Sequence, residues 1–175
     1  MSNDDKARFA TVVVPHLADA FALARWLTGN RADAEDVVQD ACLRAYRAIG
    51  SFADVNARAW VLTIVRHTAY TWLRRNRSAA LVIVDDLEAV ERAQANPAEP
   101  DRATPETELI AKADSARLEA AIAELPVPFR ETLVLRDVQG LDYREIAAVT
   151  EVPIGTVMSR LARARRRLIA RIAKD

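Results

Sequence analysis

Hydrophobic and polar residues alternate along this chain with the period of an α-helix. Apolar side chains recur three and four positions apart, and no run alternates residue by residue as a half-buried strand does. Alanine, leucine and arginine are frequent, whereas the 175 residues include only 4 glycines. Because this composition favours helices, we expect an all-α protein.

The first amphipathic stretch covers residues 8–28 and predicts one helix, starting near Pro15. Gly29 and Asn30 follow it, and such residues commonly end a helix. The residues expected to face inward are Leu17, Phe21, Ala24, Trp26 and Leu27.

A second amphipathic helix follows, up to about Phe52. Carboxylates crowd its start, where they are favoured by the positive end of the helix dipole: Asp33, Glu35 and Asp36. Its apolar stripe predicts a buried face made of Val38, Ala41, Cys42, Ala45, Ile49 and Phe52. The opposite face carries Asp36, Asp40, Leu43 and Arg47.

The polar face of this helix has two interpretations that the spacing leaves open. A leucine among charges, Leu43, is typical of a surface that docks on another protein. Equally, Leu43 is an ordinary exposed apolar residue on a solvated face that an Asp40 to Arg44 pair supports.

Residues 56–77 combine cations with aromatic rings. They hold five arginines, one histidine and no acidic residue, interleaved with Trp60, Tyr70 and Trp72. Cations attract phosphates and aromatic faces stack on unstacked bases, so the composition favours contact with single-stranded nucleic acid. The alternative is that the tryptophans belong to the core and the arginines surround it.

Residues 78–115 are predicted to be a flexible acidic linker. They contain Pro97, Pro100 and Pro105, three basic residues and nine acidic ones. The flanking residues 1–77 and 116–175 each carry 11 basic and 8 acidic side chains, although the whole chain is neutral. This distribution predicts two small helical domains, at residues 1–78 and 113–175, joined by a linker over residues 79–112.

The second domain is predicted to begin with two helices, from about Asp114 to Leu125 and from Phe129 to Val138, the latter closed by Gly140. The expected core of this domain is Leu118, Ile122, Leu125, Leu133, Leu135, Ile146, Val149, Val157 and Leu161.

A helix-turn-helix motif follows. Asp142 and Glu145 are spaced as a capping box for a helix from Tyr143 to about Thr150, and Pro153 breaks that helix. The next helix has an apolar stripe made of Val157, Leu161, Ala164, Leu168 and Ile172. Its opposite face carries Ser159, Ala162, Arg163 and Arg166, flanked by Arg160 and Arg167.

This second helix has the charge expected for the major groove of DNA. Residues 154–174 carry seven arginines or lysines and no acidic residue. A helix that is merely solvated usually mixes both signs of charge, so we prefer nucleic-acid contact to an arginine-rich helix of a bundle.

Other chemistry finds little support. Cys42 is the only cysteine, so no internal disulfide or thiolate zinc cluster is expected, and no His or Cys lies at a metal-binding distance from His16. We find no catalytic triad and no glycine-rich phosphate loop. The N-terminus lacks the features of a signal peptide, and no run of about 18 apolar residues occurs. We expect a cytoplasmic protein without membrane insertion that is not an enzyme and needs no cofactor or metal.

Two blocks of the sequence carry a family resemblance. AEDVVQDACLRAYRAIGSF and ARAWVLTIVRHTAYTWLRR, an acidic linker, and ELPVPFRETLVLRDVQGLDYREIAAVTEVPIGTVMSRLARAR together resemble a bacterial extracytoplasmic-function sigma factor of the sigma-70 family. The resemblance covers residues 10–77 and 113–172. It implies that the first domain binds the clamp helices of the largest subunit of core RNA polymerase and captures the melted minus 10 promoter element. The second domain would read the minus 35 element, and an anti-sigma factor is an expected partner.

The resemblance also implies site residues. Those matching the polymerase-binding motif are Asp36, Gln39, Asp40, Leu43, Arg44 and Arg47. Those matching the minus 10 loop are Arg66, His67, Thr68, Ala69, Tyr70 and Thr71, followed by Trp72, Arg74 and Arg75 on the next helix. In the minus 35 element, bases would face Met158, Ser159, Ala162 and Arg163, and phosphates would face Thr156, Arg160 and Arg165, with Arg166 beside them.

Two questions stay open at this level. The residues alone predict a continuous helix through His67, since no glycine or proline interrupts it, whereas the resemblance implies a loop there. A helix-turn-helix regulator that acts without polymerase is the alternative function, although it leaves residues 33–77 without a task.

Overall fold

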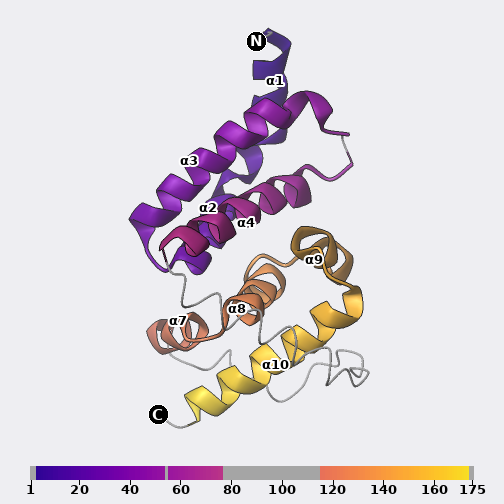
Figure 1. Cartoon of the computed structure of the whole chain (residues 1–175). Helices are drawn as coiled ribbons and strands as arrows, with labels where there is room; N and C mark the ends of the chain where they lie inside the picture. Colours follow the sequence, from indigo (N-terminus) through magenta and orange to yellow (C-terminus); the bar gives the residue numbers. More distant parts are fainter. Residues whose placement is uncertain (1–2, 54, 77–114, 174–175) are drawn as a thin grey trace. The chain divides into compact units, whose positions relative to one another are not determined.

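The computed structural model describes residues 3–53, 55–76 and 115–173 of the chain. Every regular element in these ranges is helical, and the chain divides into two compact units (Figure 1). The all-α prediction with two helical domains is therefore confirmed. Most of the predicted linker lies outside the described residues, so its limits and those of the two domains stay a prediction.

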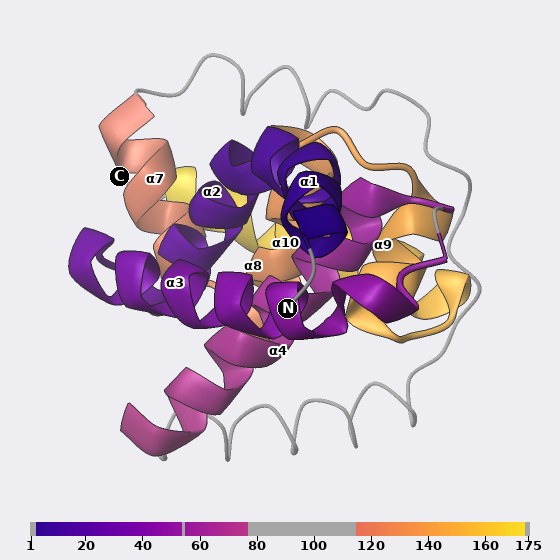
Figure 2. The same cartoon turned by 90° about the horizontal axis from the view of Figure 1, so that it is seen from above.

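The first unit contains helices α1 to α4. The elements are α1 (Asn3–Val12), the 3₁₀ helix η1 (Val14–His16), α2 (Leu17–Thr28), α3 (Arg31–Ala48), the 3₁₀ helix η2 (Ile49–Ser51) and α4 (Ala57–Asn76). Helices α2, α3 and α4 pack against one another in pairs (Figures 1 and 2). This three-helix core positions the outer faces of α3 and α4.

The predicted helix start near Pro15 agrees with the structure, where α2 begins at Leu17 directly after η1, but the separate helix α1 before it was not predicted. Pro15 has no backbone N–H to donate, so the helical ladder is interrupted there by η1, and α1 precedes it as a separate helix. The predicted end is confirmed, because Gly29 adopts a left-handed conformation with φ 88° and donates its N–H to the Arg25 carbonyl at 2.9 Å.

The buried residues of α2 and α3 differ in part from the predicted ones. In α2 the buried residues include Leu23, Ala24 and Leu27, whereas the predicted Phe21 and Trp26 are only half-buried. In α3 the buried residues are Ala34, Val37, Ala41 and Ala45, and the predicted Val38 and Cys42 are half-buried. Helix α3 contacts both α2 and α4, so its alanines, which let backbones approach closely, face them in place of the larger side chains.

The second unit contains α7 (Ser115–Ala123), α8 (Val127–Leu133), the π-helical turn η3 (Val134–Val138), residues 143–147 of α9 (Tyr143–Thr150) and α10 (Ile154–Ile172). Helix α10 packs against α7 and α8. Helix α8 starts before the predicted Phe129, because prolines are tolerated at the first turn of a helix and Pro126 serves as the cap.

The end of the α8 segment widens. Gln139 donates its N–H to the Val134 carbonyl five residues back at 2.9 Å, and Gly140 ends the segment with φ 72°, as predicted. The predicted core of this unit is buried except for Leu118, which is half-buried; Phe129 and Leu141 complete it and were not predicted.

The segment Asp4–Thr28 is long and apolar enough to meet a length-and-composition criterion for a membrane span, with a mean hydropathy of 1.3 in its best window. Core helices of soluble proteins and N-terminal signal sequences meet the same criterion. Here η1 interrupts the segment, and Leu23, Ala24 and Leu27 are buried.

Candidate functional site

The polar face of α3 is formed as the sequence predicts. The residues matched to the polymerase-binding motif are all exposed, and we call them the docking face: Asp36, Gln39, Asp40, Leu43, Arg44 and Arg47. The expected ion pair is present, with 2.9 Å between Arg44 Nη2 and Asp40 Oδ2. Leu43 keeps 53% of its surface exposed between these charges. An exposed pair of this kind contributes only about 0.3–0.5 kcal/mol to stability, so the fold does not require this arrangement of charges.

Helix α4 runs without interruption from Ala57 to Asn76. The prediction from the residues alone is therefore the correct one, and the loop that the resemblance implied at Arg66 to Thr71 is helical. Thr68 and Ala69 are buried in this helix, so they are not available to DNA in this structure. The reason is geometric, since consecutive residues of a helix point in different directions and some of them must face the core.

The remaining minus 10 residues lie on the outer side of α4. His67, Arg74 and Arg75 are exposed, and the others are half-buried: Arg66, Tyr70, Thr71 and Trp72. The guanidinium carbon of Arg66 lies 4.5 Å from the centroid of the Tyr70 ring. Cations and aromatic rings thus share one helix surface, which is the combination that holds single-stranded nucleic acid.

The described residues between η2 and α4, at positions 52, 53, 55 and 56, are not helical. Phe52 packs its ring 4.8 Å from that of Trp60, and Asn56 accepts the Ala59 N–H at 2.9 Å as the cap of α4. Val55, between them, is 88% exposed. The break between the two predicted helical stretches, after Phe52 and before residue 56, is confirmed, but no role for it was predicted.

The helix-turn-helix forms as predicted at its N-terminal end. Asp142 and Glu145 make both capping-box hydrogen bonds, from the Glu145 N–H to Asp142 Oδ1 at 2.8 Å and from the Asp142 N–H to Glu145 Oε2 at 2.9 Å. Arg136 supports the approach to this cap, because its Nη1 donates to the Leu141 carbonyl at 2.9 Å and its guanidinium carbon lies 5.0 Å from the Tyr143 ring centroid.

Helix α10 has the predicted buried stripe. Val157, Leu161, Ala164 and Leu168 are buried, and Ile172 is half-buried. On the other side, Ala162 and Arg166 are exposed, and the remaining matched residues are half-buried: Thr156, Met158, Ser159 and Arg163. These residues form the surface that a DNA groove could reach, and we call them the recognition face.

Two arginines assigned to phosphate contact are occupied inside the unit. Arg160 is only 2% exposed, and α8, which packs against α10, buries the carboxylate of Glu131. Buried charges are stable only with compensating partners. Because its side chain is buried, Arg160 is a core residue. Arg165 holds Asp137 with two hydrogen bonds, Nη2 to Oδ1 at 2.8 Å and Nε to Oδ2 at 3.2 Å, and its side chain is 13% exposed.

Comparison with known proteins agrees with this arrangement. The family model for sigma-70 region 2 matches residues 12–79, and the model for sigma-70 region 4 matches residues 115–168. The chain is 31% identical to the ECF RNA polymerase sigma factor SigE of Mycolicibacterium smegmatis, over 93% of this chain and 61% of that protein. It is 33% identical to the RNA polymerase sigma-H factor of Pseudomonas aeruginosa, over 92% of this chain and 84% of that protein.

Among solved structures, the sigma factor RpoE of Bartonella quintana, crystallised with the anti-sigma factor NepR, matches with a TM-score of 0.68. The sequence identity is 27%, and the match covers 99% of each chain. The chain belongs to the extracytoplasmic-function sigma factors. The docking face thus lies in region 2 of a sigma factor, and the recognition face lies in region 4.

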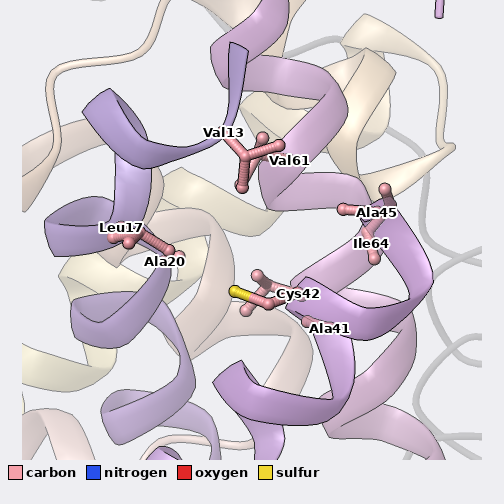
Figure 3. Close-up of a pocket in the computed structure, with 9 residues that line it drawn as sticks. Val13, Leu17, Ala20, Ala41, Cys42, Ala45, Val61 and Ile64 are labelled. Atoms are coloured by element: carbon pink, nitrogen blue, oxygen red, sulfur yellow. The ribbon is translucent and has the colours of Figure 1, made fainter. Parts of the chain in front are cut away.

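The sigma factor also has a small apolar cavity in its first unit. The residues around it come from α2, α3 and α4 and from Val13, which lies between α1 and η1 (Figure 3): Val13, Leu17, Ala20, Ala41, Cys42, Ala45, Val61, Ile64 and Val65. Its volume of about 10 Å³ leaves no room for an organic ligand. Burial raises the pKa of the Cys42 thiol, which disfavours its thiolate form. Within the described residues, no group of three or more metal-ligating side chains comes together.

Proposed function

We propose that this sigma factor binds core RNA polymerase and directs promoter recognition and melting at the start of transcription. The observation that carries the proposal is the coexistence of an exposed docking face on α3 with a recognition face on α10, one in each unit of a single chain. The chain would catalyse nothing itself, because phosphodiester chemistry belongs to the polymerase.

In this proposal the docking face binds the clamp helices of the largest polymerase subunit. Leu43 supplies apolar contact, and the surrounding charges, such as Asp40 and Arg47, supply complementarity. Asp40 and Arg44 can replace their mutual ion pair with contacts to polymerase at a small cost in free energy, because this half-exposed pair contributes little to the stability of the fold.

The minus 10 contact is proposed for a smaller set than the sequence implied. The exposed cations and half-buried aromatic residues of α4 remain: Arg66, His67, Tyr70, Thr71, Trp72, Arg74 and Arg75. The loop around Val55 joins them, because an exposed apolar side chain on an irregular segment can contact an unstacked base. Thr68 and Ala69 are removed from the set because they are buried.

The minus 35 contact is proposed for the recognition face of α10. Arg163 is the arginine that we assign to a base edge, since arginine binds guanine with two hydrogen bonds, and Arg166 would neutralise a phosphate. Arg160 and Arg165 are assigned to the internal structure of the unit instead.

The setting of this activity is also a proposal. A cytoplasmic location follows from polymerase and chromosome being there. The Bartonella quintana relative was crystallised with an anti-sigma factor, and we propose that such a partner holds this chain inactive until a stress or another signal releases it.

Run-off transcription tests the proposed function. Purified core polymerase, the chain and a library of genomic fragments should yield RNA with discrete start sites, identified by sequencing, that are absent without the chain. No RNA at any site, or failure of the chain to join the polymerase, would contradict the proposal.

A further inference from the structure

We propose that α1 holds the loop between η2 and α4 in the position from which that loop captures an unstacked promoter base, and that Arg8 is the positioning residue. This inference rests on the proposed function. The region 2 match begins at residue 12, so α1 (Asn3–Val12) lies almost wholly before it. The sequence pattern predicts no separate role for α1, whereas the contacts of this helix indicate one.

Helix α1 is packed onto the body of the unit. It contacts α3 and η2, beside the C-terminal end of α3 (Figure 1). The rings of Phe9 on α1 and Tyr46 on α3 meet edge to face, with 5.4 Å between their centroids and 71° between their planes. Val12 and Val13, at the end of α1, are buried. The helix is therefore fixed relative to α3 and can transmit that position to a neighbouring segment.

Arg8 connects α1 to the loop by a hydrogen bond. Its Nη2 donates to the backbone carbonyl of Phe52 at 2.6 Å, a partly buried hydrogen bond across 44 residues of sequence. A guanidinium donor makes this bond stronger than one between neutral groups. Phe52 is the first residue after η2, and its own N–H donates to the Ile49 carbonyl at 3.2 Å. Arg8 thus fixes the residue at which the loop leaves the helical structure.

Two further contacts hold the ends of the loop, and one apolar side chain of the loop is exposed. The Phe52 ring packs on Trp60, and Asn56 caps α4 at the other end of the loop. Val55, between these anchors, is 88% exposed, and an exposed valine in this position has no role in the core. A segment that is held at both ends and presents an apolar side chain can contact a base with little further loss of conformational entropy.

The experiment compares three variants of the full chain. Arg8→Ala removes the hydrogen bond, Arg8→Lys keeps a cationic donor, and Lys6→Ala removes one charge from an exposed position of the same helix. The first readout is amide hydrogen exchange over residues 49–60 in the free chain. The second is the affinity of the holoenzyme for a labelled single-stranded oligonucleotide that carries the non-template minus 10 sequence of a promoter mapped by run-off transcription.

We expect Arg8→Ala to speed exchange over residues 49–60 and to weaken oligonucleotide binding about tenfold, which corresponds to the loss of one hydrogen bond from a charged donor. Arg8→Lys should restore most of the affinity, and Lys6→Ala should match the wild type in both readouts. Affinity for core polymerase should stay the same in all three variants.

The inference is overturned if Arg8→Ala exchanges like the wild type, if exchange rises but oligonucleotide affinity is unchanged, or if Lys6→Ala shows the same losses. It is also overturned if Arg8→Ala loses core polymerase in parallel with the oligonucleotide, because Arg8 would then support only the fold. A failure of the proposed function would give a different result, because the wild-type chain itself would then not join core polymerase or bind the oligonucleotide with it.

Discussion

At the scale of single residues, the structure separates arginines that the sequence makes look alike. Arg160, Arg163, Arg165 and Arg166 lie within two turns of one helix, yet the first is buried and the third is held by Asp137. Arg163 and Arg166 are the arginines of the recognition face that we propose for contact with a nucleic acid. The chemistry of an arginine is thus decided by what lies beside it rather than by its charge.

Arg160→Ala should destabilise the second unit by about 3 kcal/mol, because it removes a side chain that is only 2% exposed and takes a buried charge away from the groups around it. Urea denaturation of the full chain, followed by circular dichroism, measures this loss. Arg166→Ala is the matched control, since it removes an exposed arginine of the same helix and should leave stability nearly unchanged. Unchanged stability with weaker DNA binding would mean that Arg160 contacts phosphate after all.

Arg163→Ala should weaken holoenzyme binding to the minus 35 element by about 1–3 kcal/mol and relax the base preference at one position. Arg166→Ala should weaken binding evenly across sequences and lower the salt dependence of binding, as loss of a phosphate contact does. Competition binding with single-base variants of the element separates these two outcomes. An even loss across all sequences for Arg163→Ala would show that it contacts only phosphate.

At the scale of elements, each helix divides its residues between a core and one working face. Helix α3 buries alanines against α2 and α4 and presents the docking face to solvent. Helix α4 likewise has a buried side and an outer side. Because this helix is continuous, some of the residues that the family resemblance assigned to a loop lie on its buried side and the others on its outer side. The residues just before α4, and the helix α1 that contacts Phe52, are the segments for which we propose a role beside α4.

Asp40→Arg should abolish association with core polymerase while leaving the fold intact, because it reverses a charge at the centre of the docking face and opposes the neighbouring Arg44. Co-purification with core enzyme measures the association, and circular dichroism checks the fold. Glu35→Arg is the matched control: it makes the same charge change on the same helix and also breaks an i,i+4 pair, with Arg31, but lies outside the docking face. Normal co-purification of Asp40→Arg would show that α3 docks elsewhere.

At the scale of the whole molecule, the balance of charge suits a factor that binds DNA only as part of a larger assembly. The chain carries 25 basic and 25 acidic side chains, and residues 78–115 carry more acid than base, whereas residues 1–77 and 116–175 carry more base than acid. Non-specific DNA affinity depends on net positive charge and counterion release. A neutral chain with two mildly basic domains has little of this attraction when it is alone.

The free chain should therefore bind a promoter duplex poorly, and core polymerase should restore tight binding. Gel shifts with and without core enzyme at one fixed salt concentration measure the difference. The same assay addresses the alternative of a helix-turn-helix regulator, which would bind its duplex unaided. Tight and sequence-specific binding by the free chain would favour that alternative.

The sequence by itself determined the helices, their main breaks and the family. Periodicity, the capping box of Asp142 and Glu145 and the left-handed glycine after Val138 are local signals, because each depends on residues only a few positions apart. Pro15 was visible too, but the extra helix before it was not separated, since both sides of the break share one apolar pattern.

Only the tertiary structure decided which side chains remain available. Arg160 is buried although it flanks the predicted polar face of α10, Arg165 pairs with Asp137, 28 residues away, and the Phe52 carbonyl accepts from Arg8, 44 residues away. A helical period gives the direction of a side chain but not the partner that it meets there. Partners come from distant segments that approach only on folding, so the working faces could be assigned only once the helices were packed.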